Sequence, residues 1–170
     1  MLLYHGSNTV IEKINLAKGR PFKDFGKGFY LTTIEEQAVF MAKRTCRIFH
    51  GSPFVTKFEF DDETLKNSGL NVKKFDAPTT DWAMFVLNNR NRTFMDFTDE
   101  NSNHDNKYDI VIGAVANDDI VLLFRDFSNG RIDMNALANG MKYKKLSNQY
   151  SFHTDKAVSL LTKKEAKSYE

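Results

Sequence analysis

The chain has 170 residues, a length typical of one domain, and 41% of them are apolar. Lys and Arg total 24 against 22 Asp and Glu, so the net charge of +2 gives no electrostatic argument for a nucleic-acid or membrane partner. A single cysteine excludes an intramolecular disulfide, and the sequence shows neither a signal peptide nor an apolar run long enough to cross a membrane. We therefore expect one domain over 1–170, located in the cytoplasm.

Strands and helices alternate along the chain without a regular βαβ rhythm. Aromatic, β-branched or apolar runs predict strands at 2–4, 29–32, 54–60, 108–115 and 149–152. Apolar spacing and capping residues predict helices at 34–48, 77–89, 118–127, 134–141 and 154–161, the first with Thr33 and Glu36 as a capping box. The charged residues 162–170 are expected to fray. This mixture favours the α+β class over a doubly wound sheet.

Three short segments carry residues suited to chemistry. Residues 3–7 read Leu-Tyr-His-Gly-Ser and place His5 at the end of a strand, beside a glycine whose backbone a ligand could approach closely. Residues 24–32 read Asp-Phe-Gly-Lys-Gly-Phe-Tyr-Leu-Thr, a tight turn followed by a strand in which Tyr30 offers a face for ring stacking. Residues 148–152 read Asn-Gln-Tyr-Ser-Phe. Each segment alone has an ordinary structural explanation.

In this order, the three segments resemble the signature of the ADP-ribosyltransferases of the diphtheria-toxin and poly(ADP-ribose) polymerase class. In that class a strand ends in His-Gly-Ser or His-Gly-Thr, a Phe-Gly-x-Gly-aromatic-Tyr segment follows, and a later strand opens with Glu in a context such as Asn-Glu-Tyr. The first two segments match, and the third has Gln149 where the class has Glu. The chain is also similar to a family of bacterial proteins with the same opening and the same Gly-rich segment. The resemblance covers the two ends of the chain and leaves 54–146 with general shape only.

The resemblance implies an α+β fold built on a split mixed sheet with flanking helices, with NAD bound in a cleft between the sheet halves. NAD is then the substrate, and no metal is needed. By the same resemblance the Gly6 backbone and Ser7 would hold the nicotinamide carboxamide, Tyr30 would stack on the nicotinamide ring, and His5 would bond a ribose hydroxyl. With Gln149, His5 and Tyr30 would form the catalytic set.

Three further residues are assigned to NAD by the same route. Gly28 belongs to the Gly-rich turn, Arg20 in the preceding loop is a candidate contact for the adenosine phosphate or ribose, and Phe40 in the following helix is a candidate for the second ring of the nicotinamide sandwich. Metal binding is not predicted, because Cys46 and His50 have helical spacing but no second pair of ligands accompanies them.

The neutral Gln149 leaves three functions open. The family's Glu places negative charge beside the 2′-hydroxyl of the ribose, which becomes cationic as the nicotinamide bond breaks. An amide can accept from that hydroxyl but cannot act as a base. Single-unit transfer to a protein or nucleic-acid acceptor is therefore expected, with polymer formation disfavoured. A non-catalytic NAD- or ADP-ribose-binding module and an NAD glycohydrolase are the alternatives. Resemblance alone also suggests a bacterial toxin neutralised by an antitoxin protein.

Overall fold

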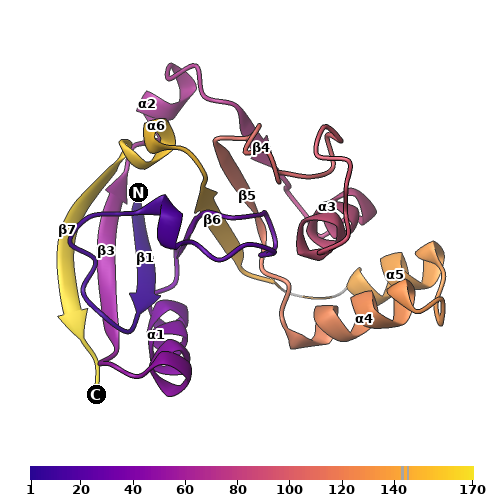
Figure 1. Ribbon diagram of the computed structural model, residues 1–170, viewed down its shortest axis with the longest axis horizontal. Helices are drawn as coiled ribbons and strands as arrows, with labels where there is room; N and C mark the ends of the chain where they lie inside the picture. Colours follow the sequence, from indigo (N-terminus) through magenta and orange to yellow (C-terminus); the bar gives the residue numbers. More distant parts are fainter. Residues whose placement is uncertain (143, 145) are drawn as a thin grey trace.

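The computed structural model describes residues 1–142, 144 and 146–170, and this part of the chain forms a seven-stranded sheet with the order β4-β5-β6-β2-β1-β3-β7. Only the β4–β5 pair is parallel, so the sheet is mixed. Its strands are β1 (Leu2–Ser7), β2 (Phe29–Thr32), β3 (Phe54–Phe60), β4 (Val72–Lys74), β5 (Ile110–Ala114), β6 (Asn148–Phe152) and β7 (Leu161–Ser168). Figure 1 shows this sheet flanked by helices, which confirms the α+β class.

Six α-helices and one short 3-10 helix accompany the sheet in the described residues. They are η1 (Leu16–Lys18), α1 (Glu35–Phe49), α2 (Asp62–Lys66), α3 (Thr80–Arg90), α4 (Asp118–Ser128), α5 (Met134–Met141) and α6 (Asp155–Val158). Asn117 and Asp133 cap α4 and α5 with their side chains, as such residues commonly do. In Figure 1, α3, α4 and α5 gather beyond β5, whereas α1 lies beside the β1 and β3 end of the sheet.

Apolar side chains fall into two buried clusters on this framework. One joins α3, α4 and α5 to β5 and includes Trp82, Phe85 and Phe124. The other lies among β1, β2, β3, β5 and β6 and includes Phe58 and Phe152. The continuous apolar run of β5 is buried at every position, as its sequence predicts for a strand inside a sheet. The two clusters together hold the central strands in place.

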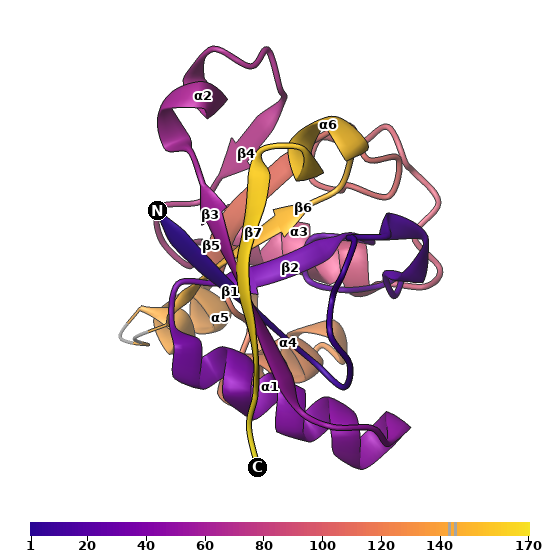
Figure 2. The same ribbon diagram turned by 90° about the vertical axis from the view of Figure 1, so that its left-hand side faces the viewer.

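The sheet is weakly joined between β1 and β2. These strands share one paired position, Tyr4 opposite Thr32, whereas β1 pairs with β3 at six positions and β2 with β6 at four. In Figure 2, β2 runs across the view while β1 and β7 run down it. Beyond Tyr4, therefore, the end of β1 diverges from β2, and this divergence bounds the candidate site described below.

The C-terminal predictions need correction. Residues 162–170 were expected to fray, but Leu161–Ser168 form the edge strand β7, paired with β3 at seven positions. The predicted helix at 154–161 is reduced to α6, capped by Thr154. The charged composition explains the error, because an edge strand keeps one side in solvent and tolerates lysines there.

Two smaller differences lie near the N-terminal half. The predicted capping box of Thr33 and Glu36 does not form: Ile34 occupies the N-cap position of α1 without a side-chain cap. The hydroxyl of Thr32 instead accepts from the backbone N–H of Ile34 at 3.1 Å. The short elements α2 and β4 were not predicted, since five and three residues carry too little periodicity.

Candidate functional site

The first predicted segment forms the end of β1, and His5 bridges the divergence from β2. Its Nδ1 lies 2.8 Å from the carbonyl oxygen of Tyr30, and its ring stacks on Phe29 with 4.2 Å between centroids. Burial lowers the pKa of His5 from 6.5 to about 4, while the Tyr30 hydrogen bond opposes that shift and Lys23 adds to it. At neutral pH the ring is therefore uncharged. Because a carbonyl only accepts, Nδ1 carries the proton, and Nε2 is an acceptor with no partner among the described residues.

Gly6 and Ser7 follow on β1, and both already make close contacts within the protein that the sequence does not indicate. A Cβ on Gly6 would lie 1.9 Å from the carbonyl oxygen of Ala38 and 2.8 Å from the backbone nitrogen of Ala42, both on α1. Ser7 is buried and its hydroxyl donates to the carbonyl of Thr9. Close packing on α1 thus requires the glycine, and the Ser7 hydroxyl retains only its acceptor capacity.

Tyr30 lies on β2 with its hydroxyl held by the Gly-rich turn. The hydroxyl donates to the carbonyl of Gly26 at 2.6 Å and accepts from the backbone N–H of Phe25 at 3.0 Å. Burial, and secondarily the charge of Asp24, raise the pKa of Tyr30 well above its usual value. The phenol therefore stays protonated and fixes the ring on the turn. The ammonium of Lys23 lies 5.2 Å from the ring centroid, within cation–π distance.

The second glycine of this turn packs against β6. A Cβ on Gly28 would lie 2.6 Å from Nδ1 of His153, the residue that follows β6. That nitrogen lies 2.9 Å from the carbonyl of Lys27, and Nε2 lies 2.8 Å from the hydroxyl of Ser151. Burial lowers the pKa of His153 to about 4, although the Lys27 hydrogen bond opposes the shift. Gly28 is thus explained by a buried neutral imidazole that positions the turn.

The third segment brings Gln149 against a buried carboxylate. Gln149 Nε2 donates to Asp24 Oδ2 at 2.7 Å, and more weakly to the carbonyl of Ala114 at 3.4 Å. Asp24 is only 7% exposed, and its Oδ1 accepts from Arg90 Nε at 2.8 Å and Nη2 at 2.6 Å. The backbone N–H of Ala116 donates to Oδ2 at 3.2 Å. Four donors therefore surround one acid that joins the Gly-rich turn to α3 and β6.

Positive charge gathers around the same turn. Burial lowers the pKa of Lys23; Asp24 opposes that shift, and the nearby charges of Arg20, Arg90 and Arg44 add to it. One carboxylate, Asp24, is thus accompanied by four cationic side chains. A cationic rim of this kind favours an anionic ligand, such as the pyrophosphate of a dinucleotide.

The predicted residues lie on neighbouring strands, on the loop before β2 and on α1. His5, Tyr30 and Gln149 come from the consecutive strands β1, β2 and β6. The guanidinium of Arg20 stacks on Phe49 at the end of α1, 4.2 Å from its centroid, and remains close enough to influence Lys23. Phe40 is 62% exposed on α1, and its ring contacts no aromatic ring in the described part of the chain. The stacking of Tyr30 and Phe40 on a nicotinamide ring stays a prediction.

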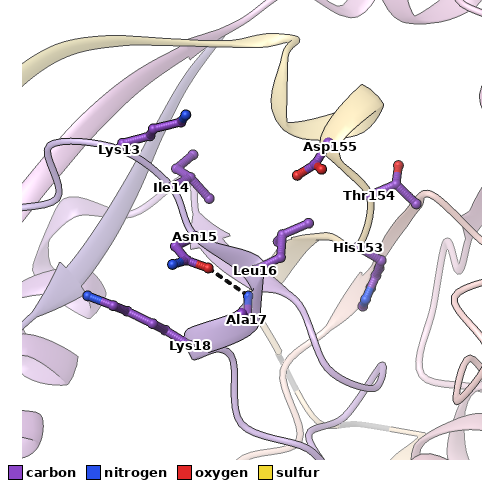
Figure 3. A pocket seen from close by; sticks show the side chains of 9 residues that line it. All are labelled: Lys13, Ile14, Asn15, Leu16, Ala17, Lys18, His153, Thr154 and Asp155. Atoms are coloured by element: carbon purple, nitrogen blue, oxygen red, sulfur yellow. Dashed lines mark hydrogen bonds between the residues drawn. The ribbon is translucent and has the colours of Figure 1, made fainter.

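A hollow of about 640 Å³ lies beside these residues and is not lined by the predicted catalytic set. Figure 3 shows its lining, which comes from the loop that contains η1 and from the residues after β6: Lys13, Ile14, Asn15, Leu16, Ala17, Lys18, His153, Thr154 and Asp155. His153 is the link between the two regions, since its ring also meets the edge of Tyr30 at 6.3 Å. The polar contacts around Tyr30 and Gln149, more than this hollow, identify the candidate site.

Sequence reasoning missed the residues that support the predicted ones. Asp24 is the first residue of the recognised segment 24–32, but no role was assigned to it, and Lys23 directly precedes it. The charges of these two residues were the available signal. Arg90 is 66 positions from its partner Asp24, at the end of α3, and no sequence pattern links the two. His153 follows the third segment directly, but a histidine beside a strand has many ordinary explanations.

No group of three or more His, Cys, Asp or Glu residues is placed to hold a metal ion within residues 1–142, 144 and 146–170. Over the same residues, no helix is both long and apolar enough to span a bilayer.

Comparison with known proteins places the chain in a family without adding a function. No curated protein and no solved structure matches it. One family model matches residues 1–162, which include every residue of the candidate site and end inside β7. The chain therefore belongs to the family described as protein of unknown function (DUF3990).

Proposed function

We propose that this protein is an ADP-ribosyltransferase that binds NAD where β1 diverges from β2, breaks the nicotinamide–ribose bond and transfers a single ADP-ribose unit to a macromolecular acceptor. The observation that carries the proposal is that His5, Tyr30 and Gln149 lie on the three consecutive strands β1, β2 and β6. The three come from opposite ends of the chain and match the motif order of the enzyme class.

The protonation states support specific roles. The neutral His5 ring leaves Nε2 as an acceptor for a ribose hydroxyl. The Tyr30 ring already attracts the ammonium of Lys23, and the electron-rich face that binds this cation would equally attract the cationic nicotinamide ring. The oxygen of Gln149, whose nitrogen is engaged by Asp24, would accept from the ribose 2′-hydroxyl.

The reaction itself is a displacement at one carbon. The bond between ribose C1′ and the nicotinamide nitrogen breaks, and both electrons leave with neutral nicotinamide. The ribose develops oxocarbenium character, which an acceptor dipole at the 2′-hydroxyl stabilises. The acceptor atom then bonds to C1′ and releases its proton to water. Lys23 and its arginine neighbours would meet the pyrophosphate, which carries the negative charge of the substrate.

The test uses NAD labelled in its adenylate phosphate, incubated with the purified protein and a cell lysate. We expect label on protein or nucleic acid, with release of nicotinamide. Tyr30→Ala should abolish both, whereas Tyr169→Ala, which removes a tyrosine from the C-terminal end, should abolish neither. Circular dichroism of each variant would establish that it is folded.

The remaining outcomes separate the alternatives. Nicotinamide release without labelled acceptor would replace the transferase by an NAD glycohydrolase. Intact NAD, together with saturable binding of NAD or ADP-ribose, would replace it by a non-catalytic binding module. If the protein neither cleaves NAD nor binds NAD or ADP-ribose, the proposal is refuted outright.

A further inference from the structure

The buried carboxylate of Asp24 requires an explanation that packing does not supply. It lies under the Gly-rich turn at 7% exposure, and its four donors come from Arg90 on α3, from the backbone of Ala116 and from Gln149 on β6. Burying an ion pair is seldom the most stabilising solution, since apolar side chains of similar volume often serve as well or better. Fold stability alone therefore does not explain a buried charge in contact with a candidate catalytic amide, and a functional role has to be considered.

The contacts of Gln149 fix which end of its amide faces which way. A carboxylate and a carbonyl can only accept, so the group between Asp24 and the carbonyl of Ala114 must be the NH₂. The assignment of nitrogen and oxygen, often ambiguous for a glutamine, is determined here by its partners. The oxygen Oε1 then points away from Asp24, and it accepts no hydrogen bond from the described residues.

We infer that Asp24 is a positioning residue that orients Gln149 Oε1 toward the ribose 2′-hydroxyl and supplies the negative charge that a neutral glutamine lacks. The inference rests on the proposed function and specifies how that function operates without the usual glutamate. The negative charge polarises the amide through its N–H, and this increases the acceptor strength of Oε1 at the moment when the ribose becomes cationic. All four contacts of Asp24 are with donors, which suits a residue that holds the amide in place.

Asp24 and Gln149 together supply one carboxylate and one amide, but the amide occupies the strand position that the carboxylate has in the ADP-ribosyltransferases described above. In the enzyme class that the three segments resemble the carboxylate stands on the strand, whereas here the amide stands on β6 and the carboxylate of Asp24 contacts its nitrogen. Restoring the glutamate alone would therefore not improve the enzyme. Gln149→Glu would set two carboxylates within hydrogen-bonding distance, where like charges repel. Changing Asp24 to Asn at the same time would restore one amide and one carboxylate in contact.

The experiment is a four-member cycle of wild type, Asp24→Asn, Gln149→Glu and the double variant, with nicotinamide release from NAD as the readout. We expect each single variant to lose on the order of 10²-fold in kcat, with KM changed less than kcat. The double variant should recover most of that loss. Asp126→Asn is the matched control, because it removes the carboxylate of another Asp–Arg pair, between Asp126 on α4 and Arg131. This variant should leave the rate unchanged.

A structural role would give a different pattern. If Asp24 only stabilised the fold, Asp24→Asn would lower the urea midpoint while the rate per folded molecule stayed constant, and the double variant would be no faster than the single ones. Equal kcat for wild type and Asp24→Asn would overturn the inference but leave the transferase in place. Failure of the wild type to cleave NAD would overturn the proposed function, and with it the role of Asp24.

Discussion

Among single residues, Gly6 shows how one position can satisfy both packing and chemistry. A glycine beside His5 suits the approach of a ligand, yet the space that a side chain would occupy is filled by the backbone of α1. The contact distance of 1.9 Å from a Cβ to the Ala38 carbonyl is impossible without movement of the strand or of the helix. Any substitution here therefore moves the end of β1 relative to α1.

We predict that Gly6→Ala destabilises the protein by about 2–4 kcal/mol, at or above the usual range for overpacking, because backbone atoms cannot yield as side chains do. Chemical denaturation of both proteins would measure the change. Gly130→Ala is the matched control: its φ of 68° disfavours alanine but its Cβ would meet nothing within 4 Å, so a cost of about 1 kcal/mol is expected. Equal losses for the two variants would show that α1 adjusts freely.

Whether a residue of the candidate site could be identified from the sequence depends on how far along the chain its partners lie. His5, Tyr30 and Gln149 could be singled out because each sits in a short segment whose local pattern is distinctive, and their catalytic roles stay predictions. The partners that set their protonation and orientation could not, because Arg90 reaches Asp24 only after α3 has packed. Phe40 was assigned from the resemblance, and the structure shows that its side chain is exposed on α1.

At the level of elements, strong periodicity decided which segments could be predicted. The sequence pattern predicted α3, α4, α5 and the buried strand β5 to within a few residues, since each combines apolar spacing with a capping residue or a continuous apolar run. By contrast, β7 has lysines at three of its eight positions and no buried residue, so its strand character comes only from pairing with β3. Tertiary pairing of this kind leaves little local signal.

We predict that deleting residues 161–170 strongly destabilises the fold. Seven paired positions would be lost, and the edge of β3, which carries the buried Phe58 and Phe60, would be exposed. With about 1 kcal/mol for each backbone hydrogen bond, the loss would be on the order of 5 kcal/mol, a large part of the usual stability of a domain. Urea unfolding and light scattering would detect the lower midpoint and the aggregation of an open edge.

A shorter deletion provides the control for this experiment. Removing only Tyr169 and Glu170 keeps every β3–β7 pair but loses the hydrogen bonds from the Tyr169 hydroxyl to Glu35 and from Lys43 to the Glu170 carbonyl, which link the C-terminus to α1. A loss near 1 kcal/mol is expected, because the Lys43 contact is exposed and the Tyr169 contact is only partly buried. If the ten-residue deletion were no worse than this one, β7 would not be an integral strand of the sheet.

In the whole molecule, the strand order makes neighbours of strands that are far apart in the sequence. Placing β6 beside β2 and β2 beside β1 sets residues 5, 30 and 149 on three neighbouring strands, although they lie far apart in the sequence. The same arrangement encloses two imidazoles, because His5 closes the divergence on one side and His153 supports the turn on the other. The site and the acid stability of the fold therefore depend on the same buried groups.

We predict that stability falls as the pH is lowered from about 6.5 toward 4. Both His5 and His153 have a pKa near 4 in the folded protein, against 6.5 when exposed, so between these values the unfolded chain binds more protons than the folded one. Each histidine then removes at most about 1.4 kcal/mol per pH unit from the free energy of unfolding. Urea unfolding of the wild type, of His5→Gln and of His153→Gln at pH 7.5, 6.5 and 5.5 would measure the slopes. Each variant should lose about half of the wild-type slope, since glutamine cannot titrate; a wild-type stability that is flat over this range would show that neither imidazole is held neutral by burial.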